Sequence, residues 1–170
     1  MTKSEVMELL RSRRALFDAK VAAVPRDALD EPIPRSTRTV KEIVAHVSNY
    51  EQLIVDRLTS AGHGAGTALR HDQLGFDPGN DRDWPDVTSR APEQVLRRAA
   101  DVFDALMQTV GDLSDDELNE AIGATAALDK EWLQGRAPWE MIAIDAYDHY
   151  PMHFPALDAA IERATLARLG

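Results

Sequence analysis

The sequence of 170 residues contains no cysteine. Without thiols there is no disulfide framework, no cysteine nucleophile and no sulfur ligand for zinc or an iron–sulfur cluster. Any bound metal ion must therefore be held by histidine and carboxylate side chains. The chain has the length of one ordinary domain, which can bury a sufficient core without cross-links. We expect residues 1–170 to form a single domain.

Long hydrophobic runs are also missing. None approaches the roughly 18 apolar residues that a membrane-spanning helix needs. The first residues, MTKSEVMELL, lack the apolar centre and the small-residue cleavage site of a secretory signal. These absences predict a cytoplasmic protein without a membrane partner.

Basic side chains are fewer than acidic ones. The chain has 19 lysines and arginines against 29 aspartates and glutamates, for a formal net charge of -10. Affinity for the phosphate backbone depends mainly on Lys and Arg side chains that displace counterions, so we expect no nucleic-acid partner. The one basic cluster, RSRR at residues 11–14, is interpreted as the solvated face of a helix.

Four segments repeat apolar side chains at helical spacing. The first two begin with a threonine and a glutamate at capping-box spacing, and the last two begin with a proline in the first turn. A short helical turn is expected at SDDEL, residues 114–118. The predicted principal helices are residues 3–24, 40–61, 92–110 and 139–168.

The segment from about residue 60 to 90 is rich in Gly, Pro, Asp and His and has no sustained period. A loop of this length is uncommon inside a compact domain unless it is functional or crosses from one end of a bundle to the other. A crossover would leave the second and third helices parallel. Strand-like alternation of useful length is absent, so the fold class is all-α, a four-helix bundle.

The last predicted helix contains two prolines, Pro151 and Pro155. Each removes a backbone donor and crowds the carbonyl four residues earlier. We therefore expect a kink in this part of the helix, and the carbonyls of Tyr147 and Pro151 should lose their helical partners.

Three histidines are candidate metal ligands. His149 and His153 are four residues apart, so on a helix both rings lie on one face, close enough to chelate one ion. The glutamate of an HExxH zinc site is absent, because Tyr150 follows His149. Two ligands alone bind weakly, and His46, on the apolar stripe of the second helix, fits the third position. Three imidazoles leave at least one coordination position for water or substrate.

The spacing has other interpretations. A histidine on an apolar face is commonly a core residue hydrogen-bonded to a backbone carbonyl. Asp145, one turn before His149, could accept the second ring N–H, complete a coordination sphere, or be an exposed or capping carboxylate. Tyr50, one turn after His46, is interpreted as a packing residue, with contact to a metal-bound substrate as the alternative.

Two segments resemble a known family. TVKEIVAHVSNYE resembles the second-helix signature of the DinB/YfiT-like superfamily, and IDAYDHYPMHFPALDAAI resembles its carboxy-terminal helix. The resemblance covers the whole chain in order and implies an up-down-down-up four-helix bundle with a nickel- or zinc-type site at His46, His149 and His153. The chain departs from the family pattern at residues 151 and 155. It is also similar to the colibactin self-protection branch, in which the metal triad is not a reliable feature.

The resemblance also implies a function. Family members include isomerases and S-transferases that use low-molecular-weight thiols. It therefore implies a metal-dependent enzyme, a transferase, isomerase or hydrolase of detoxification type, with a small-molecule substrate and a divalent zinc or nickel ion. The alternative is a non-catalytic bundle that binds or sequesters a small molecule. Bundles often associate through exposed apolar faces, so a homodimer is the expected assembly.

Overall fold

The computed structural model describes residues 1–36, 38–62, 87–121 and 135–169. Regular structure in these ranges is helical, apart from an isolated antiparallel bridge between Pro32 and Thr39. The elements are α1 (Lys3–Ala23), η1 (Arg26–Ala28), α2 (Val40–Gly62), α3 (Pro92–Asp112), α4 (Asp115–Asn119), α5 (Pro138–Ile142), η5 (Ala143–Tyr147), η6 (Tyr150–His153) and α6 (Phe154–Leu169).

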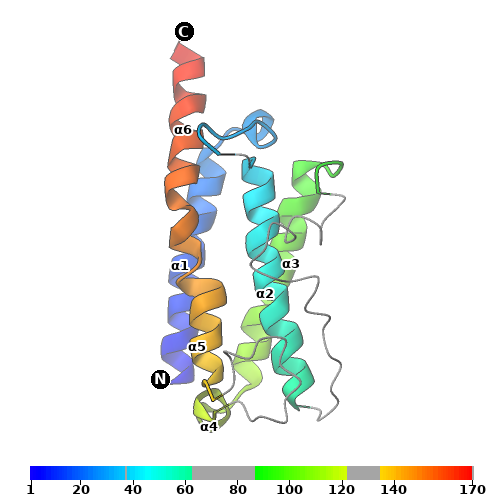
Figure 1. Cartoon of the computed structure of the whole chain (residues 1–170), viewed down its shortest axis with the longest axis vertical. Coiled ribbons are helices and arrows are strands. Elements are labelled where there is room, and N and C mark those ends of the chain that lie inside the picture. The colour runs from blue at the N-terminus through cyan, green and yellow to red at the C-terminus, as the bar shows by residue number, and fades with distance from the viewer. Residues whose placement is uncertain (37, 63–86, 122–134, 170) are drawn as a thin grey trace.

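The helices have the expected up-down-down-up order. In Figure 1, α1 runs upward, α2 and α3 both run downward, and the chain from α5 to α6 runs upward again. The parallel arrangement of α2 and α3 in Figure 1 agrees with the arrangement expected from the sequence. Most of the predicted crossover loop, residues 63–86, lies outside the described residues. The all-α four-helix bundle is confirmed.

Local capping signals set the helix starts. Capping boxes begin α1, α2 and α4, and prolines occupy the first turn of α3 and α5. The predicted end of α3 before Gly111 is wrong, because the helix continues to Asp112. Gly111 does not adopt the positive φ that ends many helices, so its backbone remains compatible with the helix.

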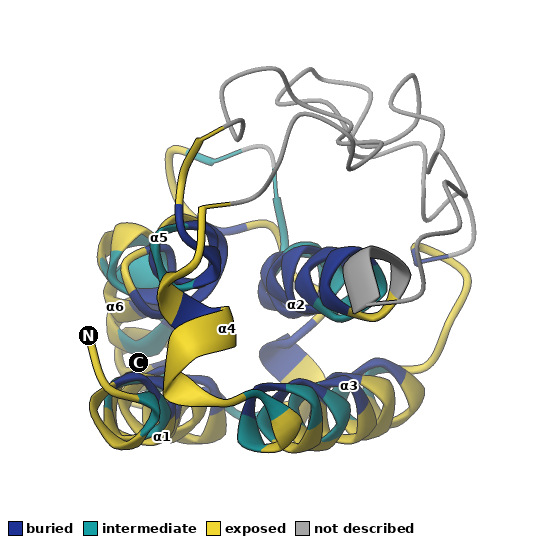
Figure 2. Ribbon diagram, turned by 90° about the horizontal axis from the view of Figure 1, so that it is seen from below, coloured by how far each residue is buried: buried dark blue, intermediate teal, exposed yellow. Residues whose placement is uncertain are grey.

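The core lies where the inward faces of the helices meet. In Figure 2, which looks along the bundle, exposed residues cover the outer faces of α1 and α3, while buried residues face the interior. No helix in the described part of the chain is long and apolar enough to cross a membrane. The largest fully buried side chains are Tyr150, Phe17, Leu10, Ile33, Ile43, Ile54, Leu106, Leu118, Met141, Ile142 and Leu157.

The last helix is interrupted at the histidines, as the prolines predict. η5 is a π-helical segment, in which the Asp148 N–H donates to the Ala143 carbonyl at 2.9 Å. η6 is a 3₁₀ segment, and the Phe154 N–H donates to the Pro151 carbonyl. The expectation that this carbonyl lacks a helical partner is therefore wrong. A 3₁₀ turn uses the N–H three residues ahead, so the missing N–H of Pro155 is not needed.

Candidate metal centre

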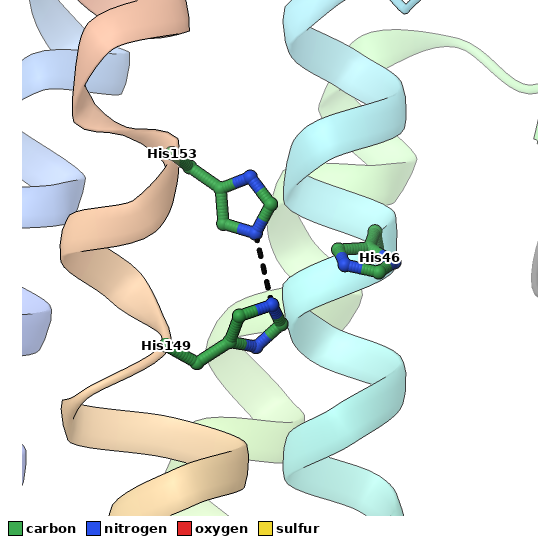
Figure 3. Close-up of side chains that lie close together, drawn as sticks. All are labelled: His46, His149 and His153. Carbon is green, nitrogen blue, oxygen red and sulfur yellow. Dashed lines mark hydrogen bonds between the residues drawn. The ribbon is translucent and has the colours of Figure 1, made fainter. Parts of the chain in front are cut away.

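The three predicted ligands face one another across two elements. Figure 3 shows the rings of His149 and His153 pointing from the last helix toward α2, which carries His46. His46 follows the buried positions Ile43 and Ala45, so its ring lies at the edge of the core. The 3.0 Å contact between their Nε2 atoms places His149 and His153 on the same side (Figure 3), although a 3₁₀ turn lies between them.

The ring nitrogens are close enough for a shared ion. One nitrogen from each histidine lies within 4.8 Å of the others, and His149 Nε2 is 3.0 Å from His153 Nε2. With metal–nitrogen bonds of about 2.1 Å, two ligands at a right angle lie about 3.0 Å apart and two opposite ligands about 4.2 Å apart. The His149–His153 separation of 3.0 Å fits a common ion. The wider spacing of up to 4.8 Å within the cluster exceeds about 4.2 Å, so the rings must move closer together to share an ion.

The rings present their edges to one another rather than stacking. Their centroids are 5.1 Å apart for His46 and His149, 5.2 Å for His46 and His153, and 4.8 Å for His149 and His153. The interplanar angles for these pairs are 73°, 80° and 62°. Nonparallel ring planes are compatible with in-plane nitrogen lone pairs that meet at one ion.

Burial keeps all three imidazoles neutral. It lowers the pKa of His46 to about 3 and the pKa of His153 to about 4, with smaller contributions from neighbouring histidines and Arg38. The pKa of His149 is also lowered by burial, to about 4, partly offset by the backbone carbonyl of Asp145. Neutral imidazole is the form that binds metal, so the site is ready to coordinate near neutral pH.

The buried Nδ1 of His149 tests whether the cluster fits a metal. This atom makes no hydrogen bond within the described residues, while the backbone carbonyl of Asp145 raises the pKa of the ring. A proton on Nδ1 directed at that carbonyl leaves the Nε2 lone pair free on the side of His153. This is the tautomer of a metal-ligating histidine. Without a metal, the 3.0 Å contact is satisfied by an N–H···N hydrogen bond between the two rings.

Tyr50 and Asp145 have different roles beside the histidines. The Tyr50 ring is buried and packs edge-on against His46 and His149, with centroids 5.0 and 4.7 Å away, which supports the packing interpretation. The Asp145 carboxylate is neither exposed nor a cap. It is buried in an ion pair and accepts a 2.7 Å hydrogen bond from Arg57 Nη1. Sequence analysis missed this partner.

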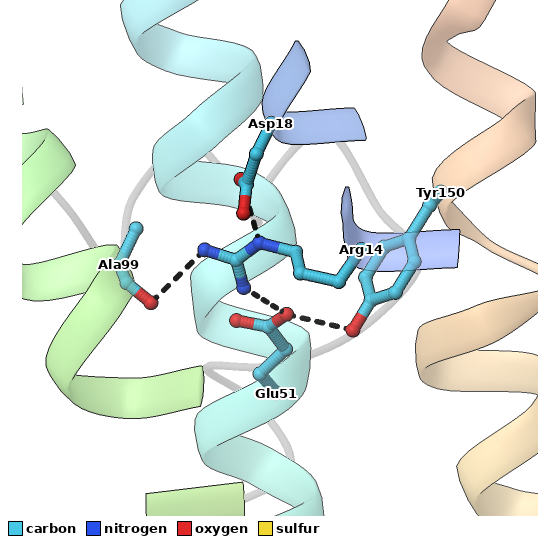
Figure 4. A network of polar contacts seen from close by, with 5 residues as sticks. All are labelled: Arg14, Asp18, Glu51, Ala99 and Tyr150. Carbon is cyan, nitrogen blue, oxygen red and sulfur yellow. Dashed lines mark hydrogen bonds and ion pairs between the residues drawn. The ribbon is translucent and has the colours of Figure 1, made fainter. Parts of the chain in front are cut away.

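A second polar cluster joins side chains of α1, α2 and the last helix to the backbone of α3 (Figure 4). Arg14 Nη1 donates to Glu51 Oε1 at 2.5 Å, and the Tyr150 hydroxyl donates to the same oxygen at 2.8 Å. Arg14 also donates to Asp18 at 2.8 Å and to the Ala99 carbonyl at 3.2 Å. Interpreting RSRR as solvated is therefore wrong for Arg14. The spacing of Arg14 from the apolar positions of α1 places it on the buried face of that helix, and this is the sequence signal that was missed.

The Arg14–Glu51–Tyr150 cluster is linked to the candidate metal centre by the backbone, because Tyr150 is the residue that follows His149. Burial raises the pKa of the Glu51 carboxyl, and the neighbouring Arg14 opposes that shift. Burial and the adjacent Glu51 raise the pKa of Tyr150 well above its ordinary value. The tyrosine hydroxyl therefore keeps its proton and remains a donor to Glu51.

Comparison with known protein families shows to which family the chain belongs. A family model described as the DinB superfamily matches residues 8–150, which is most of the sequence. The chain belongs to the DinB superfamily. The matched range includes His46 and His149 and ends three residues before His153. Comparison with curated proteins gives no match.

Among solved structures, the chain is similar to the colibactin self-resistance protein ClbS in complex with a dsDNA. The TM-score is 0.71 with 16% sequence identity, over 96% of this chain and 95% of that chain. At this identity the likeness shows a shared fold along nearly the whole of both chains.

The same comparison corrects the expectation of no nucleic-acid partner. A protein of this fold is in complex with double-stranded DNA, so the exclusion drawn from net charge is wrong. Net charge sums over the whole surface, whereas phosphate contacts depend on local groups of basic side chains. Exposed arginines do occur next to each other in this chain, at Arg97 and Arg98 of α3.

Proposed function

We propose that His46, His149 and His153 hold one divalent metal ion in a site that acts on a small molecule. The convergence of three neutral imidazoles, with one nitrogen of each within 4.8 Å of the others, carries this proposal. Imidazole ligands suit zinc and nickel, and three of them leave a coordination position for substrate. Membership of the DinB superfamily supports the assignment.

The proposed chemistry depends on the metal ion and on the absence of cysteine from the chain. When bound, the ion polarises a substrate carbonyl or lowers the pKa of a bound thiol or water. Because the chain has no cysteine, a thiolate must come from a low-molecular-weight cosubstrate. We therefore propose a transferase, isomerase or hydrolase reaction of detoxification type.

The chain's own residues hold the ligands in place. Tyr50 packs against the rings of His46 and His149, which limits their rotation. The buried Arg57–Asp145 ion pair joins α2 to η5, one turn before His149. A site fixed in this way does not have to be reordered when substrate arrives.

A second candidate function is non-catalytic binding of a small molecule. The similar structure is that of a self-resistance protein, and protection can result from sequestration as well as from turnover. The dsDNA in that structure adds a nucleic-acid partner that must be tested with the same protein.

The proposal is tested by comparing metal-loaded protein with protein stripped by a chelator. Turnover is followed by absorbance with chlorodinitrobenzene and a panel of low-molecular-weight thiols. We expect activity that is lost on stripping, restored by zinc or nickel, and absent in His149→Ala. Asp148→Ala is the matched control, because Asp148 is exposed and adjacent to His149. A fluorescent DNA duplex is titrated in parallel.

The outcomes separate the two functions. Chelator-sensitive turnover supports the enzyme. If no thiol gives chelator-sensitive turnover, while an electrophile raises the melting temperature of the metal-free protein, the sequestering function replaces it. Equal activity of the His149→Ala and Asp148→Ala variants would remove the histidines from the mechanism.

A further inference from the structure

A pocket of about 480 Å³ opens between α1 and α3, and none of the three histidines lines it. Its apolar lining includes Val21, Val24 and Leu29, all buried. Short side chains, among them Ala22 and Ala100, also line it and leave space between the two helices. Pockets that bind small molecules typically enclose roughly 300 to 1,000 Å³, so this one has the size of a ligand site.

One wall of the pocket is a fixed cation over an aromatic ring. The Arg14 guanidinium lies 4.6 Å from the centroid of Phe103, and both residues line the pocket. Its nitrogens donate to Asp18, Glu51 and the Ala99 carbonyl. Because two carboxylates already neutralise this guanidinium, it supplies a rigid surface rather than a receptor for an anion.

The charges around the pocket favour a positively charged ligand. Four ionisable residues line it, the cations Arg14 and Arg26 and the anions Asp18 and Asp104. Both cations are paired outside the lining, Arg14 with Glu51 and Arg26 with Glu93 at 3.5 Å. Counting those two carboxylates together with the four lining residues gives two positive and four negative groups, which is a surplus of two negative charges.

Both lining carboxylates have oxygens available at the rim. Asp104 is exposed and forms no ion pair or hydrogen bond within the described residues. Asp18 bonds Arg14 Nε through Oδ1, and its side chain is 57% exposed. Apolar walls with two accessible carboxylates at the rim match a ligand that is apolar at one end and cationic at the other.

We propose that this pocket is a second binding site and that it takes an amphipathic organic cation. The apolar body of the ligand packs on the buried valines and Leu29, and its ammonium group pairs with Asp18 and Asp104. The site is separate from the histidines, so its occupancy does not require a metal ion.

The test uses three probes with one apolar body, namely phenylbutylamine, phenylbutanol and phenylbutyrate, titrated by calorimetry into the full chain. We expect the amine to bind more tightly than the alcohol and the carboxylate to bind least. Asp104→Asn should weaken the amine about three- to fivefold, as expected for an exposed ion pair. Asp101→Asn, an exposed carboxylate of α3 that does not line the pocket, should leave binding unchanged.

Two further variants test whether the amine binds in this pocket. Ala100→Leu fills the pocket from an exposed position and should abolish binding of the amine without unfolding the protein. His149→Ala should leave binding intact, because the amine does not use the histidines. Equal affinity for the amine and the carboxylate, equal loss in Asp101→Asn and Asp104→Asn, or loss of binding in His149→Ala would each overturn the proposal. Full binding by Ala100→Leu would do the same.

Discussion

Replacing Arg14 with methionine should destabilise the protein strongly. The Arg14 side chain is 5% exposed and lies against Glu51, whose side chain is fully buried. Methionine fills much of the volume of the arginine stem but leaves the Glu51 charge without its cation. Glu51 Oε2 already lacks a hydrogen-bond partner within the described residues, so no spare donor can replace the guanidinium.

The magnitude follows from the burial of the pair. Removing one member of a buried ion pair costs about 3 to 5 kcal/mol of unfolding free energy. For a chain of this length, about 2 to 4 °C is lost per kcal/mol, so the melting temperature should fall by about 6 to 20 °C. Tyr150→Phe removes one hydrogen bond to a charged group and should cost less, about 1.5 to 3 kcal/mol.

The assay is a double-mutant cycle with thermal and urea unfolding of metal-free protein. Arg14→Met together with Glu51→Met removes both charges and should be more stable than Arg14→Met alone. Arg13→Met is the control, because Arg13 is exposed on the same helix. If Arg14→Met and Arg13→Met shift the melting temperature equally, the buried ion pair does not contribute as argued.

Two further predictions concern the pH dependence of stability and the replacement of Pro151. The folded pKa values of His46, His149 and His153 are lowered to about 3 to 4. The unfolded chain therefore takes up protons first as pH falls below about 6.5, and metal-free stability should drop by up to about 1.4 kcal/mol per histidine per pH unit. Urea unfolding between about pH 7.5 and 5 measures this, and a flat profile would contradict the burial of neutral rings. Pro151→Ala restores a backbone donor and should raise the metal-free melting temperature while weakening metal binding; a less stable variant with unchanged metal affinity would assign the proline to packing.

The sequence contained most of the helical layout because local signals determine it. The Thr2–Glu5 and Ser114–Glu117 pairs satisfy backbone donors within a few residues, so their effect is visible without tertiary structure. Spacing also placed His149 and His153 on one side. His46 was expected opposite them because it lies on the apolar stripe of α2 and because the family resemblance implies this ligand. The packing of α2 beside η5, which brings the rings together, is a tertiary contact.

Features that depend on packing between helices were visible only in part. The spacing of Arg14 along α1 indicated its burial, but its partner Glu51, 37 residues away in sequence, could not be predicted. The change from π to 3₁₀ geometry around His149 depends on which backbone donor reaches which carbonyl. Pro151 and Pro155 indicated an irregularity there but not its form. The pocket between α1 and α3 depends on helix separation, which a sequence does not state.

The most direct test of the central claim is the metal content of protein purified without added metal. Elemental analysis and native mass spectrometry should give close to one divalent ion per chain in the wild type and in Asp148→Ala. His46→Ala, His149→Ala and His153→Ala should each lose most of it, because every ligand contributes to one site. Equal trace metal in the wild type and all three histidine variants would show that the cluster is held together by hydrogen bonds and packing alone.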